Sequence, residues 1–137
     1  MALFSCAGVR PDGLGVKNGR LAACLSSPNC VSSDDAGDHA VAPFQLAVPV
    51  ADAWRMAQSA VSALPRTKII TQTADYLHAE CSSAVFGFVD DLELHLRPEK
   101  HAIAVRSAAR LGYSDFGVNR RRVENLREAL QERGAIR

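Results

Sequence analysis

The sequence predicts an α+β fold, in which an antiparallel twisted sheet carries both helices on one face in the order β-α-β-β-β-β-α. Two observations predict this class. Four successive segments between residues 67 and 109 are rich in β-branched and aromatic residues, and two segments with helical periodicity flank them. The 137 residues, 47% of them hydrophobic, are enough to build one core. We therefore expect one domain, residues 41–137, preceded by an irregular N-terminal arm, residues 1–40.

The arm shows neither helical nor strand periodicity. It contains five of the nine glycines, two prolines and the polar run Ser32–Asp35. Because so long a coil is unusual inside a compact domain, we expect the arm to pack on the domain or to flank it.

The domain is expected to begin with a short strand and a helix. The strand, residues 44–48, is bounded by prolines, which favours the edge of the sheet. The helix follows the start signals Pro49 and Asp52 and stops at Pro65, and a second helix follows the turn at residues 112–117 and ends at Gly134. Apolar residues recur at helical spacing in both helices: Trp54, Ala57, Val61 and Leu64, and then Val123, Leu126 and Leu130.

The other strands are expected at residues 67–73, 75–81, 85–96 and 102–109, as an antiparallel meander. Alternate side chains leave a strand on opposite faces, so residues 85–96 can be sorted by parity. Asp90 falls on the apolar side, where we expect it to find a cationic or hydrogen-bonding partner or to be turned outward by a bulge. The apolar face carries Phe86, Phe88, Leu92, Leu94 and Leu96.

A hairpin loop at residues 97–101 that keeps Leu94 opposite Val105 also places Glu93 opposite Arg106. The face away from the core then mixes acidic and basic side chains and is expected to continue into the arginine-rich turn. Its predicted members are Asp91, Glu93, His95, Arg106 and Arg110.

The arginines at the start of the last helix are the first candidate site. A helix N-terminus carries partial positive charge, so Arg120, Arg121 and Arg122 need negative groups nearby if Asn119 is the N-cap, and less so if the helix starts at Ser114 or Asp115. One interpretation is an anion-binding basin, because guanidinium groups bind phosphate or carboxylate bidentately. Its predicted residues are Arg106, Ser107, Arg110, Tyr113, Ser114, Asn119, Arg120 and Arg121. The other interpretation is internal pairing with Asp90, Asp91, Glu93 and Asp115.

Cys24 and Cys30 are a second candidate pair. They can form a disulfide if the protein meets an oxidising compartment, and otherwise help the arm to pack. As a metal half-site with His39, their five-residue spacing fits no common zinc pattern. No metal and no cofactor are expected.

An acid–base site is a third candidate, drawn from Asp90 or Asp91 with a nearby histidine whose pKa lies close to neutrality. His78 and His95 are nevertheless expected on the strand surface, and Cys81 shares the parity of core residues. The chain contains no GxSxG, HExxH, phosphate-loop or dinucleotide glycine pattern.

Charge and hydropathy exclude several partners. The net charge of +1 hides a local excess, because residues 106–137 hold 8 arginines against 4 acids. Nucleic-acid binding is not expected on a sheet face that mixes acids with bases. No apolar run reaches the roughly 18 residues of a membrane span. The start resembles a lipoprotein cleavage site at Leu3–Cys6 but lacks the basic residues of an export signal, so a cytoplasmic location is expected.

Four blocks of the sequence agree in order with one family. They are RPDGLGVKNGRL (10–21), CLSSPNCVSS (24–33), GFVDDLELHL (87–96) and VRSAARLGYSDFGVNRRRVE (105–124). The chain resembles, over nearly its whole length, the bacterial and plastid family catalogued as domain of unknown function 1499. The resemblance implies domain boundaries and carries over no catalytic residue. The family's usual Cys-Pro is Cys24-Leu25 here.

The sequence favours a non-catalytic binding or accessory domain whose arginine-rich surface holds a small anionic ligand, a lipid headgroup or an acidic protein segment. One alternative is a small hydrolase-like or acid–base enzyme that uses Asp90 or Asp91 with a nearby histidine. Another is a protein-interaction scaffold. An enclosed pocket with Asp90 or Asp91 beside histidine would favour the enzyme, and an open basic groove the binding domain.

Overall fold

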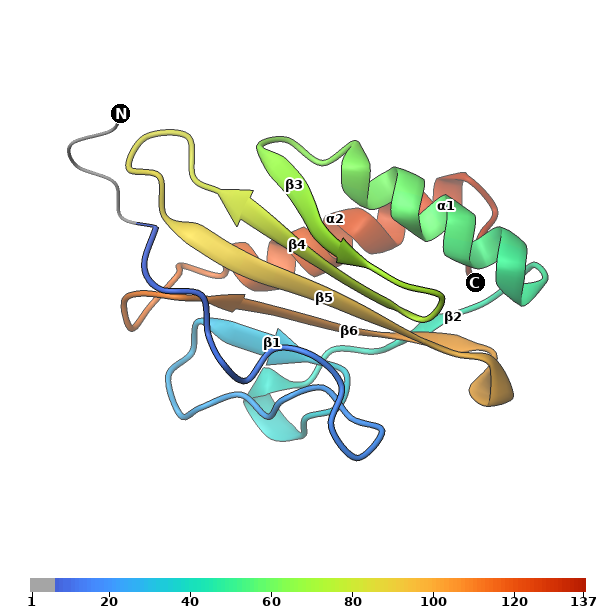
Figure 1. Ribbon diagram of the computed structural model, residues 1–137, viewed down its shortest axis with the longest axis horizontal. Helices are drawn as coiled ribbons and strands as arrows, with labels where there is room; N and C mark the ends of the chain where they lie inside the picture. Colours follow the sequence, from blue (N-terminus) through green and yellow to red (C-terminus); the bar gives the residue numbers. More distant parts are fainter. Residues whose placement is uncertain (1–6) are drawn as a thin grey trace.

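The computed structural model describes residues 7–137, which form one six-stranded antiparallel sheet and two α-helices (Figure 1). The strands run in the order β1-β6-β5-β4-β3, and β2 pairs with the same edge of β6 as β1. They are β1 (Cys30–Ser32), β2 (Phe44–Gln45), β3 (Thr67–Gln72), β4 (Tyr76–Ser82), β5 (Val89–Arg97) and β6 (Ala102–Ala109). The predicted α+β class and element order are confirmed. The Leu3–Cys6 segment considered as an export signal lies outside the described residues.

The register of the central hairpin is the predicted one. Leu94 lies opposite Val105, and Glu93 lies opposite Arg106. The connection is the short 3-10 helix η2 (Pro98–Lys100), after which His101 adopts a left-handed backbone with φ 51°. The two faces of the sheet therefore carry the predicted sets of side chains along β5 from Leu92 onward.

The predicted start of this strand at residue 85 is wrong. β5 begins at Val89, and Phe86 and Phe88 are 63% and 42% exposed instead of buried. Gly87 has φ 67°, which interrupts the extended backbone. Ser83 closes the resulting loop, because its backbone N–H donates to the carbonyl of Phe88 and its Oγ accepts from the N–H of Phe88. Residues 83–88 are therefore a hairpin loop that exposes two phenylalanines.

Helices α1 (Val50–Ser62) and α2 (Val118–Glu132) both pack on the apolar face of the sheet (Figure 1). Trp54 and Val61 of α1 are buried there, together with Val123, Leu126 and Leu130 of α2. Burying these side chains against Leu92 and Leu94 removes apolar surface from water, which is the main stabilisation of such a core. In the described part of the chain, neither helix combines the length and hydropathy needed to cross a bilayer.

The arm is more ordered than its sequence predicts. Its residues Cys30–Ser32 form β1, which extends the sheet by pairing with β6. Cys24 and Cys30 form a disulfide with their Cα atoms 5.7 Å apart. Both sulfur atoms are used in this bond, so the alternative of a metal half-site with His39 is wrong, and His39 contacts the carbonyl of Cys30 instead.

Candidate functional site

Helix α2 starts at Val118, so its three arginines lie close to the helix N-terminus. The N-cap residue is Gly117, not Asn119, and the carboxylate of Asp115, two residues earlier, accepts hydrogen bonds from the N–H groups of Gly117 (2.8 Å) and Asn119 (3.0 Å). Partial burial raises the pKa of Asp115, but the bonds from Asn119 and Gly117 outweigh it and hold the pKa below its usual value. A carboxylate of this chain therefore offsets the positive helix end.

Each of the three arginines has a different partner. Arg120 donates to the carbonyls of Asp38 and Ala40, Arg121 to the carbonyl of Phe116, and Arg122 to the carboxylate of Asp90. The expectation that Asp90 finds a cationic partner is confirmed, with 2.8 Å between Arg122 Nη1 and Asp90 Oδ2.

The structure does not bring the predicted anion-site residues together in one basin. Arg106 and Arg110 lie on the polar face of the sheet, and Ser107 lies between them in sequence but on the helix side. Asn119 donates to the carbonyl of Asn29 and accepts from Ser107, so both side chains are used inside the fold. Tyr113 and Ser114 are exposed in the turn before α2.

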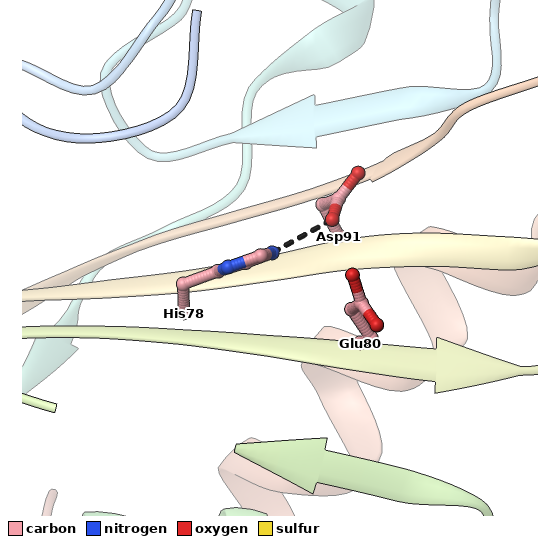
Figure 2. Close-up of side chains that lie close together, drawn as sticks. All are labelled: His78, Glu80 and Asp91. Carbon is pink, nitrogen blue, oxygen red and sulfur yellow. Dashed lines mark hydrogen bonds and ion pairs between the residues drawn. The ribbon is translucent and has the colours of Figure 1, made fainter. Parts of the chain in front are cut away.

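The polar face holds a buried ion network. Arg110 binds both carboxylate oxygens of Asp91 at 2.8 Å. It also pairs with Oε2 of Glu80, the same oxygen that Arg10 of the arm binds. His78 donates from Nε2 to Asp91 Oδ1 over 2.7 Å (Figure 2). Burial raises the pKa of Asp91, but Arg110 and His78 outweigh this and hold the pKa below its usual value.

Glu93 is the centre of a second buried cluster on this face. Its side chain is 0% exposed and accepts hydrogen bonds from the backbone N–H of Gly15 (2.7 Å) and the hydroxyl of Tyr76 (2.5 Å), while Arg106 lies 3.5 Å away. Burial, together with Glu93, raises the pKa of the Tyr76 hydroxyl. Arg106 also donates to the carbonyl of Ala22, so this cluster ties the arm to the sheet.

His78, Glu80 and Asp91 place one ligand atom each within 4.8 Å of one another, which is close enough to hold a metal ion (Figure 2). The guanidinium of Arg110 already supplies the positive charge at these carboxylates. His78 and Asp91 are 3% and 1% exposed, so the expectation that His78 lies on the surface is wrong. Arg10 and Gly15 of the arm contact carboxylates of this face, and the mutual pairing of the buried charges matches a structural ion network.

Cys81 and His95, the other two side chains considered for catalysis, lie apart from each other. Cys81 is buried in the core, as predicted, and burial raises the pKa of its thiol. His95 is partly buried and contacts Arg97 and Asp75. Neither residue lines the cavity described next.

A groove opens at the end of the sheet where the β4–β5 loop and the turn before α2 meet, at the left in Figure 1. We name it the loop groove. Its cavity of about 420 Å³ is lined by residues of the segments 82–84, 88–90, 109–112 and 114–118, together with Arg66 and Arg122. Apolar side chains dominate its walls, and they are Phe88, Val89, Leu111, Phe116 and Val118.

The floor of the loop groove is polar but internally satisfied. Arg122 donates to Asp90 and to the side-chain oxygens of Ser107 (3.2 Å) and Asn119 (2.8 Å). Burial raises the pKa of Asp90, and Arg122 opposes this increase only in part. The charge of the floor is close to neutral because one arginine faces one carboxylate.

Two arginines beside the groove use few of their hydrogen-bond donors within the protein. Arg66 lines the loop groove and an adjoining cavity of about 190 Å³, which Arg121 also lines. Arg66 donates to the carbonyl of Ser82, and Arg121 to that of Phe116. Within residues 7–137, neither arginine forms an ion pair with an acidic side chain. These two guanidinium groups keep donors for an anion from outside.

Sequence reasoning placed Ser114 and Arg121 in a site and missed Arg66 and the floor residue Arg122 as site members. Arg66 precedes β3, far along the chain from the arginine turn. The pairing of Thr67 with Cys81 carries it beside the β4–β5 loop. A register for β3 and β4, derived as it was for β5 and β6, is the signal that could have found it.

A family model described as "Protein of unknown function (DUF1499)" matches residues 20–130. Searches of the curated proteins and of the solved structures found no match to this chain.

Proposed function

The chain belongs to the DUF1499 family of proteins of unknown function, and we propose that it is a non-catalytic binding domain whose loop groove holds an amphipathic anion. The ligand class is an apolar chain that ends in a carboxylate or a phosphate. One observation carries the proposal: the apolar walls of the loop groove adjoin two arginines that lack acidic partners among the described residues. Arg66 lines the groove itself, and Arg121 lines the adjoining cavity that Arg66 also lines.

The walls suit the apolar part of such a ligand. A cavity of about 420 Å³ falls within the size range of small-molecule sites, roughly 300–1,000 Å³. Phe88, Phe116 and Leu111 are partly exposed to solvent, so covering them with an alkyl chain removes apolar surface from water on both sides of the contact.

The two arginines suit the anionic end. A guanidinium has five N–H donors in a planar fork, and each of these side chains has a single protein acceptor. The remaining donors of Arg66 and Arg121 can bind carboxylate or phosphate oxygens with charge-assisted hydrogen bonds. Asp90 does not repel the ligand strongly, because Arg122 already neutralises it.

The enzyme alternative has less support. Among the described residues, no histidine lines the loop groove beside Asp90. Asp91 hydrogen-bonds to His78, but that pair is buried with Arg110 on the polar face of the sheet. An acid–base site must reach its substrate, so this geometry favours binding over catalysis.

We also propose that the arm of residues 1–40, described here from residue 7, is a structural part of the protein that covers the domain formed by residues 41–137. Arg10 pairs with Glu80, and Gly15 donates to Glu93, which links the arm to the buried polar face. A disulfide within the arm persists in an oxidising compartment, so it favours such a compartment over the cytoplasmic location expected from the sequence.

Binding of decyl phosphate, measured by calorimetry below its micellar concentration and by thermal unfolding, tests the proposed ligand class. A ligand that binds the native state alone raises the unfolding temperature. Decyl phosphate is expected to bind more tightly than inorganic phosphate or decanol, because each of these supplies half of the contacts.

Variants of the two arginines test the site itself. A hydrogen bond to a charged group contributes about 1.5–3 kcal/mol, so Arg66→Gln and Arg121→Gln are each expected to weaken decyl phosphate binding about tenfold or more. Arg133→Gln is the matched control, since Arg133 is an exposed arginine with one carbonyl acceptor at the far end of α2. Equal affinity in the double variant Arg66→Gln/Arg121→Gln and the unmodified protein would exclude this site.

A further inference from the structure

We propose that the two loops around the groove dock this protein on an anionic lipid bilayer. Seven of the nine large apolar side chains that are exposed among residues 7–137 lie in two short segments, residues 85–88 and 111–118. Both segments lie at the same end of the sheet (Figure 1). This docking goes beyond the binding of one amphiphile, because it also depends on Val85, Phe86 and Tyr113, which are exposed and do not line the groove.

The tips of the loops carry the most exposed apolar groups. Phe86 and Val85 project from the β4–β5 loop, and Phe116 and Tyr113 project from the turn before α2, where Phe116 is 87% exposed. The ring of Phe86 stands edge-on against Phe88, with 6.0 Å between the ring centroids. Scattered exposed apolar residues are ordinary, but a cluster on adjoining loops indicates a surface that is covered in use.

The charge around the tips of the two loops favours an anionic bilayer as the partner. Residues 83–88 contain no acidic residue. The single acidic residue of the turn is Asp115, and its carboxylate accepts hydrogen bonds from N–H groups at the start of α2. Arg66 and Arg121 lie beside the tips without an acidic partner in the described chain. Aromatic side chains next to unpaired cations match the interface of a bilayer that contains anionic lipids.

The size of the surface favours a bilayer over a protein. The loops at residues 83–88 and 110–117 together hold 14 residues, fewer than the roughly 20–30 that each side of a stable protein interface contributes. Two short loops can insert between lipid headgroups, whereas a protein partner would need a surface that matches theirs in shape.

Cosedimentation with vesicles tests the inference. The full chain is expected to bind vesicles of phosphatidylcholine with phosphatidylglycerol, and to bind pure phosphatidylcholine several-fold more weakly. High salt is expected to weaken the first interaction, because it screens exposed charges. The double variant Phe86→Ser/Phe116→Ser is expected to lower the affinity for these vesicles at least about tenfold, and Arg121→Gln to lower it about fivefold.

Leu25→Ser is the matched control, because Leu25 is an exposed apolar residue outside both loops. Unfolding curves of the serine variants are expected to match the unmodified protein, since the replaced side chains lie in solvent. The inference is overturned if phosphatidylglycerol does not increase binding, or if Leu25→Ser lowers it as much as the loop variant. It is also overturned if sedimentation equilibrium shows a dimer that Phe86→Ser/Phe116→Ser dissociates. Decyl phosphate binding without vesicles is a separate measurement, so either proposal can fail alone.

Discussion

Replacing Arg110 with methionine tests how much the buried ion network stabilises the fold. The Arg110 side chain is 6% exposed and binds both oxygens of Asp91 as well as Glu80. Removing one partner of a buried ion pair costs about 3–5 kcal/mol, because the other charge is left without compensation. His78 still donates to Asp91, and Arg10 still pairs with Glu80. We therefore expect a loss of about 3 kcal/mol in the free energy of unfolding at neutral pH.

The pH dependence of this loss provides an independent check. In the unmodified protein the pKa of Asp91 is lowered, so its contribution to stability is present above the unfolded pKa of about 3.9 and is lost as the pH falls through the folded pKa. In Arg110→Met the carboxylate stays buried without its main cation, so its pKa rises. Protonation then removes the unpaired charge, and the difference between the two proteins is expected to shrink as the pH approaches about 4.

Urea unfolding of both proteins at neutral and acidic pH measures this difference. Arg55→Met is the control, because Arg55 forms an exposed ion pair with Asp52 and its loss is expected to change stability by no more than about 0.5 kcal/mol. Arg110→Lys keeps the charge and is expected to lie between Arg110→Met and the unmodified protein. A loss below about 1 kcal/mol for Arg110→Met, or a loss that grows in acid, would refute the reasoning.

Three further outcomes are expected. Cys24→Ser/Cys30→Ser is expected to lower the free energy of unfolding by about 2 kcal/mol, since the disulfide closes a short loop, and dithiothreitol should then have no further effect on urea unfolding. Asp115→Ala is expected to cost about 1 kcal/mol by thermal unfolding, because it removes the carboxylate that accepts two N–H groups at the start of α2, whereas Asp12→Ala on the exposed arm should have little effect. Stability is expected to be nearly constant from neutral pH to about pH 5 and to fall below about pH 4, because ionisation of carboxyls with a lowered pKa favours the native state; a stability that rises in acid would contradict this. These carboxyls are Asp34, Glu80, Asp91 and Asp115.

The polar face of the sheet was predictable because strand geometry repeats every two residues. Parity alone assigned Asp91 and Glu93 to one face, and the hairpin register then placed Glu93 opposite Arg106. The same rule placed Asp90 on the helix side, where burial requires a partner, and Arg122 is that partner. Parity failed at Phe86 because the backbone there is a loop and has no two-residue repeat.

The loop groove was not predictable in the same way, because residues from three distant parts of the chain form it. Arg66, the β4–β5 loop and the start of α2 meet only when β3 pairs with β4 and α2 packs on the sheet. The burial of His78 was also missed, because it depends on how the folded chain covers the polar face of the sheet.

Taken by itself, the sequence determined the helices, the meander, the register of its last hairpin and the faces on which the charged side chains of that hairpin lie, because periodicity and turn chemistry act over a few neighbouring residues. Only the tertiary structure decided which arginine meets which acceptor. Gly15 reaches Glu93 across 78 residues, and Arg122 reaches Asp90 across 32. Such contacts depend on how whole elements pack, so only the folded chain shows that Arg66 and Arg121 have no acidic partner among residues 7–137.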